Sequence, residues 1–230
     1  MSVYVLSDVH GRADEFFKML DLIEFTEEDI LYVLGDVMEY EYEPLKIMDH
    51  IMNSKNIFLL KGNQEDIFIN EIEKILELDY FVDESNSIQS YINTIDVIAR
   101  RGREYTSKLL AYLKNTPFIT SVNDFILVHG DLNISNLGEN YSLEKIFSLQ
   151  NEHECIYGRT FVNSDIALKN ITVILGHTIV MTLDRACETI LYKEGKILID
   201  CGAAINKKLA CLRLDDMKEF YIDINKENYI

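Results

Sequence analysis

Three of the five histidines in the chain lie shortly after apolar runs, and each is next to a glycine; they are His10, His129 and His177. In the N-terminal segment 3–11, β-branched and aromatic residues predict a buried strand that ends at Asp8 and His10. Side chains two positions apart on a strand point to the same side, so a carboxylate and an imidazole would be presented together. That pair suits a divalent metal ion of borderline character. Taken alone, a helix cap followed by an ordinary loop histidine explains the segment better, so the assignment depends on the rest of the chain.

The same arrangement recurs at four further strands. Apolar runs at 30–34, 57–60, 125–128 and 172–175 predict strands, and each leads into a glycine with a metal-ligand side chain nearby. These side chains are Asp36, Asn63, His129 and His177. Because open α/β sheets place their sites at the carboxyl ends of strands, five such ends predict one shared site.

A charge count favours two metal ions at this site. Two divalent cations bring four positive charges, Asp8 and Asp36 supply two negative ones, and the amide and imidazoles are neutral. About two positive charges would remain, which suits a phosphate oxyanion. Cations roughly 3.5–4 Å apart can share a hydroxide, lower its pKa and direct it in line at phosphorus. Asp36, alone on its strand, is the natural bridging ligand.

The elements that would position these residues begin as alternating strands and helices. Apolar residues at helical spacing predict helices over 12–25 and 44–52, and the second begins at a proline, which first helical turns tolerate. A polar cluster follows each of the first three strands, as expected for an open α/β sheet.

The remainder of the chain predicts a helical insert and then mainly strands. The insert covers about 66–115, with a polar break at 83–87. It carries the only dense basic cluster of the sequence, which a solvated helix face explains better than a phosphate site; the cluster is Arg100, Arg101 and Arg103. Strands are predicted at 118–122 and 125–128, then 172–175, then as antiparallel strands at 189–193, 196–200, 209–214 and 219–224. With no repeat or linker, we expect a single domain over 1–230.

Composition limits the class of protein. The chain has 230 residues, 48% of them hydrophobic, which is enough for a large core. Its net charge of −17 disfavours nucleic acid as a partner at long range, although a metal site reverses the sign locally. No apolar run approaches transmembrane length, and the four cysteines form no C-x-x-C pair. We therefore expect a cytoplasmic protein that uses no membrane, and its oligomeric state stays open.

The five polar motifs together resemble those of the calcineurin-like metallophosphoesterases, in both order and spacing. They are Asp8-Val9-His10-Gly11, Gly35-Asp36, Gly62-Asn63-x-Glu65, His129-Gly130 and Gly176-His177-Thr178. Over nearly the whole chain the sequence is most similar to the bacterial and phage serine/threonine phosphatases of the lambda phage type. Three segments stand where that branch has Thr-Leu-x-Ser-Tyr, Trp-x-Arg and Ile-Asp-Thr-Gly-Ala; they are 87–91, 157–159 and 199–203.

This resemblance implies a fold and a set of ligands. The fold is α/β, a four-layer α/β/β/α sandwich of two mixed β-sheets flanked by helices. Asp8 and His10 would hold the first metal and Asp36 would bridge. The second metal would be held by Asn63, His129 and His177. Oxygen and imidazole ligands accept Mn, Fe, Zn or Ni, and Mn is the first choice.

The sequence departs from the family on the leaving-group side. Gln64 replaces the histidine taken to protonate the leaving oxygen, and Glu39 and Tyr40 replace an aspartate and an arginine. Glutamine donates hydrogen bonds but gives up no proton, and tyrosine carries no charge. Losing a general acid costs about 10²–10⁴ in rate, while the two-metal terms are larger. We therefore expect residual turnover, best with leaving groups that depart unprotonated.

Several residues are candidates for the altered functions. Arg159 is the retained phosphate-binding candidate, and Asn63 and Tyr40 are further candidates for binding substrate. Arg12 directly follows the first motif in sequence and could replace the missing arginine. Glu39, in a desolvated pocket, could have a raised pKa and serve as the acid.

Three functions follow from the resemblance. The first is a dimetal phosphoesterase that acts on phosphomonoesters, in phosphoproteins or small phosphate esters. The second is a pseudophosphatase that binds metal and a phosphorylated partner without turnover, which the change at Gln64 favours. The third is hydrolysis of dinucleoside polyphosphates, as in a sister branch. Six intact metal positions favour an enzyme over a binding protein.

Overall fold

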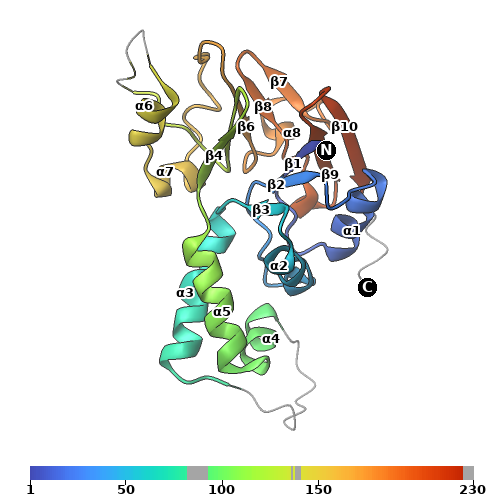
Figure 1. The fold of residues 1–230 in the computed structure, drawn as a ribbon, viewed down its shortest axis with the longest axis vertical. Helices are drawn as coiled ribbons and strands as arrows, with labels where there is room; N and C mark the ends of the chain where they lie inside the picture. The colour runs from blue at the N-terminus through green and yellow to red at the C-terminus, as the bar shows by residue number, and fades with distance from the viewer. Residues whose placement is uncertain (82–92, 136, 138–140, 225–230) are drawn as a thin grey trace.

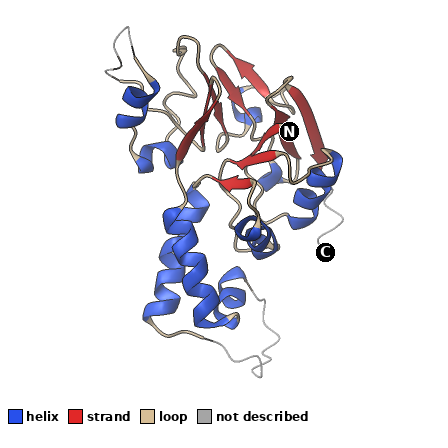
Figure 2. Cartoon of the chain, in the orientation of Figure 1, coloured by secondary structure: helices blue, strands red, loops and turns tan. Residues whose placement is uncertain are grey.

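Two mixed five-stranded β-sheets, flanked by helices, build the protein (Figures 1 and 2). The structure is a computed structural model, and it describes residues 1–81, 93–135, 137 and 141–224. The predicted polar break at 83–87 and the segment 87–91, which resembles the phage phosphatases, lie outside the described residues. The predicted sandwich of two mixed sheets with helices is confirmed.

The first sheet has the order β10-β9-β1-β2-β3. Three of its strands are parallel, and they are β1 (Val3–Leu6), β2 (Ile30–Val33) and β3 (Ile57–Leu59). Two antiparallel strands from the end of the chain complete it, β9 (Lys208–Arg213) and β10 (Lys218–Asp223). β1 lies in the centre, with β2 and β9 as neighbours, which explains why it is apolar on both faces.

The second sheet has the order β4-β5-β6-β8-β7. Its parallel centre is β5 (Phe125–Val128), β6 (Thr172–Leu175) and β8 (Lys196–Leu198). Antiparallel edge strands are β4 (Ile119–Val122) and β7 (Leu191–Lys193). The predicted antiparallel pairing is confirmed for β8 with β7, but β8 also pairs in parallel with β6 on its other side, which the sequence did not predict. Local sequence fixed the β7–β8 hairpin but carried no signal for the neighbour on the other side of β8.

The core has two parts, one on each face of the first sheet. Val3 and Val5 of β1 belong to the cluster shared with the second sheet, whereas Tyr4 and Leu6 belong to the cluster under the helices. This alternation follows from the two-residue period of a strand. The helices over that outer cluster are α1 (Ala13–Leu22) and α2 (Pro44–Asn53).

Helices α3 (Asn63–Glu77), α4 (Thr94–Arg100) and α5 (Gly102–Asn115) form an arm that projects from the sheets (Figure 1). α3 begins three residues before the predicted insert, because Glu65 caps its first turn at the Gly62 amide. Buried side chains of the arm, such as Ile72 and Leu109, continue the cluster beneath α1 and α2.

Short helices occupy three stretches between predicted strands, to which the sequence pattern assigned no element. They are α6 (Leu143–Ser148), α7 (Glu152–Tyr157), α8 (Val180–Leu183) and the 3₁₀ turn η1 (Ala203–Ile205). Side chains of Ser142 and Asn151 cap α6 and α7, which gives such short helices their start. Six-residue helices are too short to show a clear apolar period, so the sequence pattern could not reveal them.

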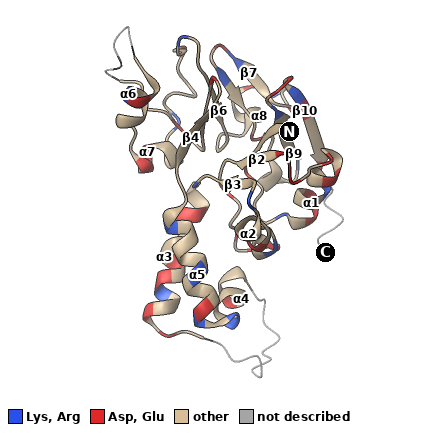
Figure 3. Ribbon diagram, viewed as in Figure 1, with Lys and Arg blue, Asp and Glu red and all other residues tan. Residues whose placement is uncertain are grey.

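Acidic and basic residues are interspersed along the arm (Figure 3). Arg101 pairs with Asp49 at 2.6 Å and Arg103 with Asp79 at 2.6 Å, as expected for a solvated basic face within an acidic surface. In the described part of the chain, no helix combines the length and the apolar character needed to cross a membrane.

Candidate metal centre

The carboxyl ends of β1, β2, β3, β5 and β6 meet, and backbone hydrogen bonds tie the loops that follow them. The amide of Asp8 donates to the Gly35 carbonyl at 3.2 Å, and that of His10 donates to the Asp36 carbonyl at 2.8 Å. The second sheet repeats the pattern, because Gly176 donates to the His129 carbonyl at 2.8 Å. All five predicted strand ends therefore contribute to one site, and their loops hold one another in place.

One cluster of ligand atoms lies after β1 and β2. Nε2 of His10 is 3.9 Å from Asp8 Oδ1 and 3.9 Å from Asp36 Oδ2. The other oxygen of Asp8 accepts hydrogen bonds from the His177 amide at 2.9 Å and from the Ser7 hydroxyl. Asp8 thus presents one oxygen to the cluster, while its second oxygen joins the two sheets.

A second cluster lies around the fully buried ring of His129. Its Nε2 is 3.1 Å from Asn63 Oδ1, 3.1 Å from His177 Nδ1 and 3.4 Å from Asp36 Oδ1. Asp36 is the residue that both clusters share, with Oδ2 facing one and Oδ1 the other. This is the geometry of a bridging carboxylate.

The donor set fits divalent cations. Nδ1 of His129 is 2.6 Å from the Leu34 carbonyl oxygen, so Nδ1 carries hydrogen and Nε2 of the neutral ring has a free lone pair. That lone pair meets the oxygens of Asn63 and Asp36. Without a proton or a cation among them these electron-pair donors repel one another; burial lowers the pKa of His129, but the charges of Asp36 and Asp8 outweigh this and raise it.

Protonation equilibria show the same demand for positive charge. Burial would lower the pKa of His10, but its hydrogen bond with Glu39 and the charges of Asp36 and Asp8 raise it to about 9. Burial, outweighing the charge of His129, raises the pKa of Asp36 to about 6. Metal ligands must be deprotonated, so cations that bind here would displace the His10 proton.

Four of the predicted ligands have left-handed backbone conformations. The φ angles are +56° for Asp8, +47° for His10, +53° for Asp36 and +60° for His177. Residues other than glycine rarely adopt this region, and such strain concentrates at functional sites. At Gly176, a Cβ atom would overlap the Ser7 hydroxyl and the Asp8 carboxylate, so only glycine lets the two sheets approach there.

Glu65 fixes the loops that carry the ligands, a structural role that the sequence analysis did not predict. Its buried carboxylate accepts hydrogen bonds from four backbone amides, at 2.8–3.0 Å; the donors are Asp36, Val37, Met38 and Gly62. The loops after β2 and β3 therefore share one anchor. The available signal was a glutamate three residues after the Gly62 cap, at the start of a helical pattern.

We expect Glu65→Gln to destabilise the protein strongly. The amide NH₂ of glutamine would face backbone N–H groups that now donate to a carboxylate, which leaves buried donors unpaired. The expected loss is about 3–5 kcal/mol in the free energy of unfolding, measured by urea denaturation. The exposed Glu77→Gln on the same helix is the control and should change it by under about 0.5 kcal/mol. A Glu65→Gln variant as stable as that control would contradict the anchor.

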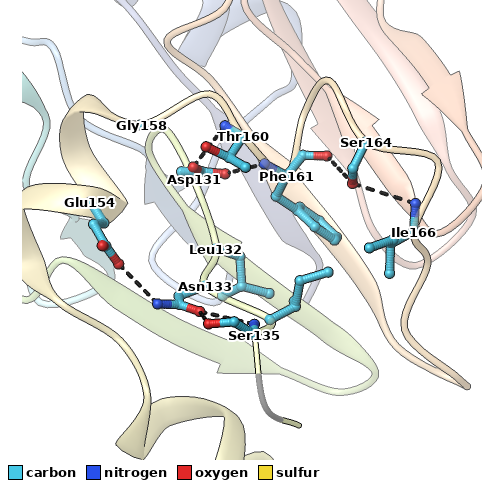
Figure 4. Close-up of a pocket in the computed structure, with 11 residues that line it drawn as sticks. Asp131, Leu132, Asn133, Ser135, Glu154, Gly158, Thr160, Phe161, Ser164 and Ile166 are labelled. Atoms are coloured by element: carbon cyan, nitrogen blue, oxygen red, sulfur yellow. Dashed lines mark hydrogen bonds between the residues drawn. The ribbon is translucent and has the colours of Figure 1, made fainter.

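Arg159, the predicted phosphate-binding residue, is exposed at the rim. Its guanidinium donates to the His177 carbonyl at 3.4 Å, which keeps the side chain beside the second cluster. The loop that carries it is held by Asp131, whose carboxylate accepts the amides of Thr160 at 2.8 Å and Phe161 at 2.7 Å (Figure 4). Asp131 directly follows the His129-Gly130 motif in sequence, but the sequence did not indicate that its carboxylate would bind the amides of Thr160 and Phe161.

A cavity of about 430 Å³ lies against this loop (Figure 4). Its lining includes Asp131, Leu132 and Phe161, and it includes none of the six predicted ligands, all of which the structure describes. The ligand clusters, rather than this cavity, are therefore the candidate site for chemistry.

Arg12 and Tyr40 contact residues other than the six predicted ligands. Arg12 is fully buried, and its guanidinium donates to the Ala203 carbonyl at 2.8 Å and to Asn206 Oδ1 at 2.7 Å. The ring of Tyr40 packs on Phe68 of α3 at 4.8 Å between centroids. These contacts engage both side chains outside the two ligand clusters, and the phosphate-binding role that the sequence suggested for them stays a prediction.

Glu39 differs from the expectation of a raised pKa. Burial raises its pKa, but the hydrogen bonds from His10 and the Tyr40 amide outweigh this and lower it. A carboxyl group stabilised in its ionised form is a poor proton donor. Asp36, by contrast, has the raised pKa, and Gln64 lies beside it, because the backbone N–H of Gln64 donates to Asp36 Oδ1 at 2.9 Å.

The structure also revises the charge count. Asp200, after β8, is buried, and burial together with the charge of Asp8 raises its pKa well above the usual range. It was a sixth strand end with an acidic residue, so the rule that found the others applied to it. Glu39, whose lowered pKa favours the ionised form, offsets one of the two surplus positive charges, whereas the raised pKa of Asp200 favours its neutral form. Attraction for phosphate would then depend on open positions at the cations and on Arg159.

Comparisons with known proteins agree with this geometry. The family model of the calcineurin-like phosphoesterases matches residues 1–196. A symmetrical bis(5'-nucleosyl)-tetraphosphatase from Wigglesworthia glossinidia brevipalpis is 39% identical over 84 residues, which are 34% of this chain and 31% of that protein. The match thus spans under a third of that relative's length.

Solved structures share the fold. A protein described as a candidate diadenosine tetraphosphatase superposes with a TM-score of 0.66 at 13% identity, covering 97% of this chain and 94% of its own. A serine/threonine phosphatase from Saccharomyces cerevisiae, similar to human phosphatase PP5, has a TM-score of 0.60 at 11% identity, covering 100% and 81%. At these identities the likeness concerns the fold alone, while the family model rests on the sequence itself. The chain belongs to the calcineurin-like phosphoesterase family.

Proposed function

We propose that the protein is a dimetal-dependent phosphoesterase that cleaves phosphoanhydrides of small nucleotides, with dinucleoside polyphosphates as the substrate class. The observation that carries the metal dependence is the sharing of Asp36 by two ligand clusters. Asp8 and His10 would hold one cation, Asn63, His129 and His177 the other. With oxygen and imidazole donors in both clusters, Mn²⁺ is the cation we propose.

The cations would supply a hydroxide nucleophile at neutral pH and neutralise charge on the phosphoryl oxygens. The residues of the chain have separate tasks. Arg159 would bind a phosphate oxygen from the rim, held there by the loop that Asp131 anchors. Gln64 would donate a hydrogen bond on the leaving-group side without transferring a proton.

The absence of a proton donor at position 64 selects the leaving group. A serine or threonine alkoxide is a strong base and needs a proton as it departs. A nucleoside phosphate departs as a stabilised anion and needs none. This difference favours phosphoanhydrides over phosphoproteins, and the tetraphosphatase relative supports the same choice.

The net charge of −17 does not exclude such polyanions, because bound cations dominate the potential inside the site. The negative charge on the rest of the protein surface would instead slow the association of the polyanionic substrate with the protein. We therefore expect turnover to rise with ionic strength at low substrate concentration, since salt screens that repulsion.

The test is a substrate panel with Mn²⁺ present: diadenosine tetraphosphate, para-nitrophenyl phosphate and a phosphoserine peptide. The first two should be hydrolysed, and the peptide should be slower by about 10²–10⁴, the usual contribution of a general acid. A phosphoserine peptide cleaved as fast as the anhydride would contradict the proposal. Tight Mn²⁺ binding without turnover of any substrate would instead identify a pseudophosphatase, the function that Gln64 favoured at the outset.

A further inference from the structure

His10 uses its two ring nitrogens in opposite directions. Nε2 faces the ligand cluster, 3.9 Å from both Asp8 Oδ1 and Asp36 Oδ2. Nδ1 lies 3.2 Å from Glu39 Oε2, on the far side of the ring. The backbone of His10 is fixed as well, because the His10 amide donates to the Asp36 carbonyl at 2.8 Å, and the ring orientation is left to its side-chain contacts.

The carboxylate of Glu39 is itself fixed. Its second oxygen, Oε1, accepts the backbone amide of Tyr40 at 2.8 Å. The preceding residues Val37 and Met38 donate their amides to Glu65, and Gly11 donates to the Val37 carbonyl at 2.9 Å. The loop that carries Glu39 is therefore joined both to the helix beneath the site and to the loop that carries His10.

We infer that Glu39 is the positioning residue for His10: it fixes the ring so that Nε2 is presented to the first metal ion. A carboxylate that accepts Nδ1–H selects the tautomer with a free lone pair on Nε2, and it makes that nitrogen a stronger base. Glu39 thus acts through His10 and transfers no proton to the leaving group. This inference rests on the proposed function, because it requires a cation at the cluster of Asp8, His10 and Asp36.

The effect on metal binding follows from this geometry. Partners of metal-bound histidines typically contribute 10–100-fold in metal affinity. Glu39→Ala removes both the acceptor and the charge, so it should weaken the first site by about that factor. Glu39→Gln keeps an oxygen that accepts Nδ1–H but removes the charge, so its loss should be smaller.

Glu41→Gln is the matched control. Glu41 is an exposed glutamate two residues away on the same loop, so its replacement removes an equal charge near the site. A general electrostatic effect would weaken Mn²⁺ binding in Glu41→Gln and Glu39→Gln alike. A positioning role would affect only the substitutions at Glu39.

The experiment is calorimetric titration of the metal-free full chain with Mn²⁺, with thermal unfolding of each metal-free variant followed by circular dichroism. We expect two equivalents for wild type and Glu41→Gln, and two equivalents with one site weakened for a folded Glu39→Ala. Equal affinities in Glu39→Ala and Glu41→Gln would overturn the inference alone. Loss of one whole equivalent would also overturn it, because Glu39 would then be a ligand. A wild-type protein that binds no Mn²⁺ would overturn the proposed function and, with it, this inference.

Discussion

Asp36→Asn is expected to abolish binding of both metal ions and to lower kcat/KM by at least about 10³-fold, because the cation pair supplies several kcal/mol of transition-state stabilisation. The reason is the division of labour between its oxygens: Oδ2 faces His10 and Oδ1 faces His129. Asparagine has one oxygen, so its NH₂ group would be turned toward one of the two clusters. Calorimetry with Mn²⁺ and hydrolysis of para-nitrophenyl phosphate measure the two effects.

The same substitution should have the opposite effect on the metal-free protein. Burial raises the pKa of Asp36 to about 6, above the usual value for aspartate in an unfolded chain. A raised pKa means that the unfolded state binds the proton less tightly, so ionisation of Asp36 destabilises the fold as pH rises through about 6. Metal-free Asp36→Asn should therefore melt at a higher temperature than wild type at pH 7.5, while it loses function.

Asp29→Asn provides a control for the chemical change itself. Asp29 is also buried, and it accepts hydrogen bonds from the amides of Ser2 and Thr26 near the amino end of β2. Its replacement should lower stability and leave two Mn²⁺ sites intact. If Asp36→Asn retained two metal ions, or if it melted below wild type without metal, the shared carboxylate would not be a bridge.

The candidate ligands could be chosen from the sequence because each choice depends on a local pattern. An apolar run that ends at a polar residue and a glycine predicts a strand end, and parallel strands bring such ends to one edge. His129 and His177, from the second sheet, could therefore be assigned with Asp8 and Asp36 from the first. The same rule would have found Asp200, which also follows a parallel strand.

Contacts between distant loops could not be predicted in this way. Arg12 lies close in sequence to His10, but its guanidinium contacts Ala203 and Asn206, which come from the other end of the chain. The sequence likewise did not show which side chain Glu39 contacts. A desolvated pocket raises the pKa of a carboxyl group, whereas a neighbouring histidine lowers it. Only the positions of both side chains decide the outcome, and here burial is outweighed by the hydrogen bonds from His10 and the Tyr40 amide together.

Gln64→His is expected to restore proton donation to the leaving group. Gln64 is the second residue of α3. Its backbone N–H donates to Asp36 Oδ1 at 2.9 Å, so its side chain begins at the edge of the ligand clusters. A histidine there can transfer a proton near neutral pH, which glutamine cannot do. For alkyl phosphates and a phosphoserine peptide, kcat should rise by up to about 10²–10⁴-fold. For diadenosine tetraphosphate it should change little, because that leaving group needs no proton.

The measurement is kcat/KM over a series of phosphomonoesters whose leaving groups differ in basicity, for wild type, Gln64→His and Gln64→Asn. Wild type should slow steeply as the leaving group becomes more basic, and Gln64→His should flatten that dependence. Gln64→Asn changes the size of the side chain without adding an acid, so it should keep the wild-type slope. The gain in Gln64→His should also stay below the upper limit, because Glu39 is engaged with His10 and Tyr40 rather than free to orient a new imidazole. An equal gain for every ester would mean that position 64 alters substrate binding, and the assignment of the missing acid to this position would then be wrong.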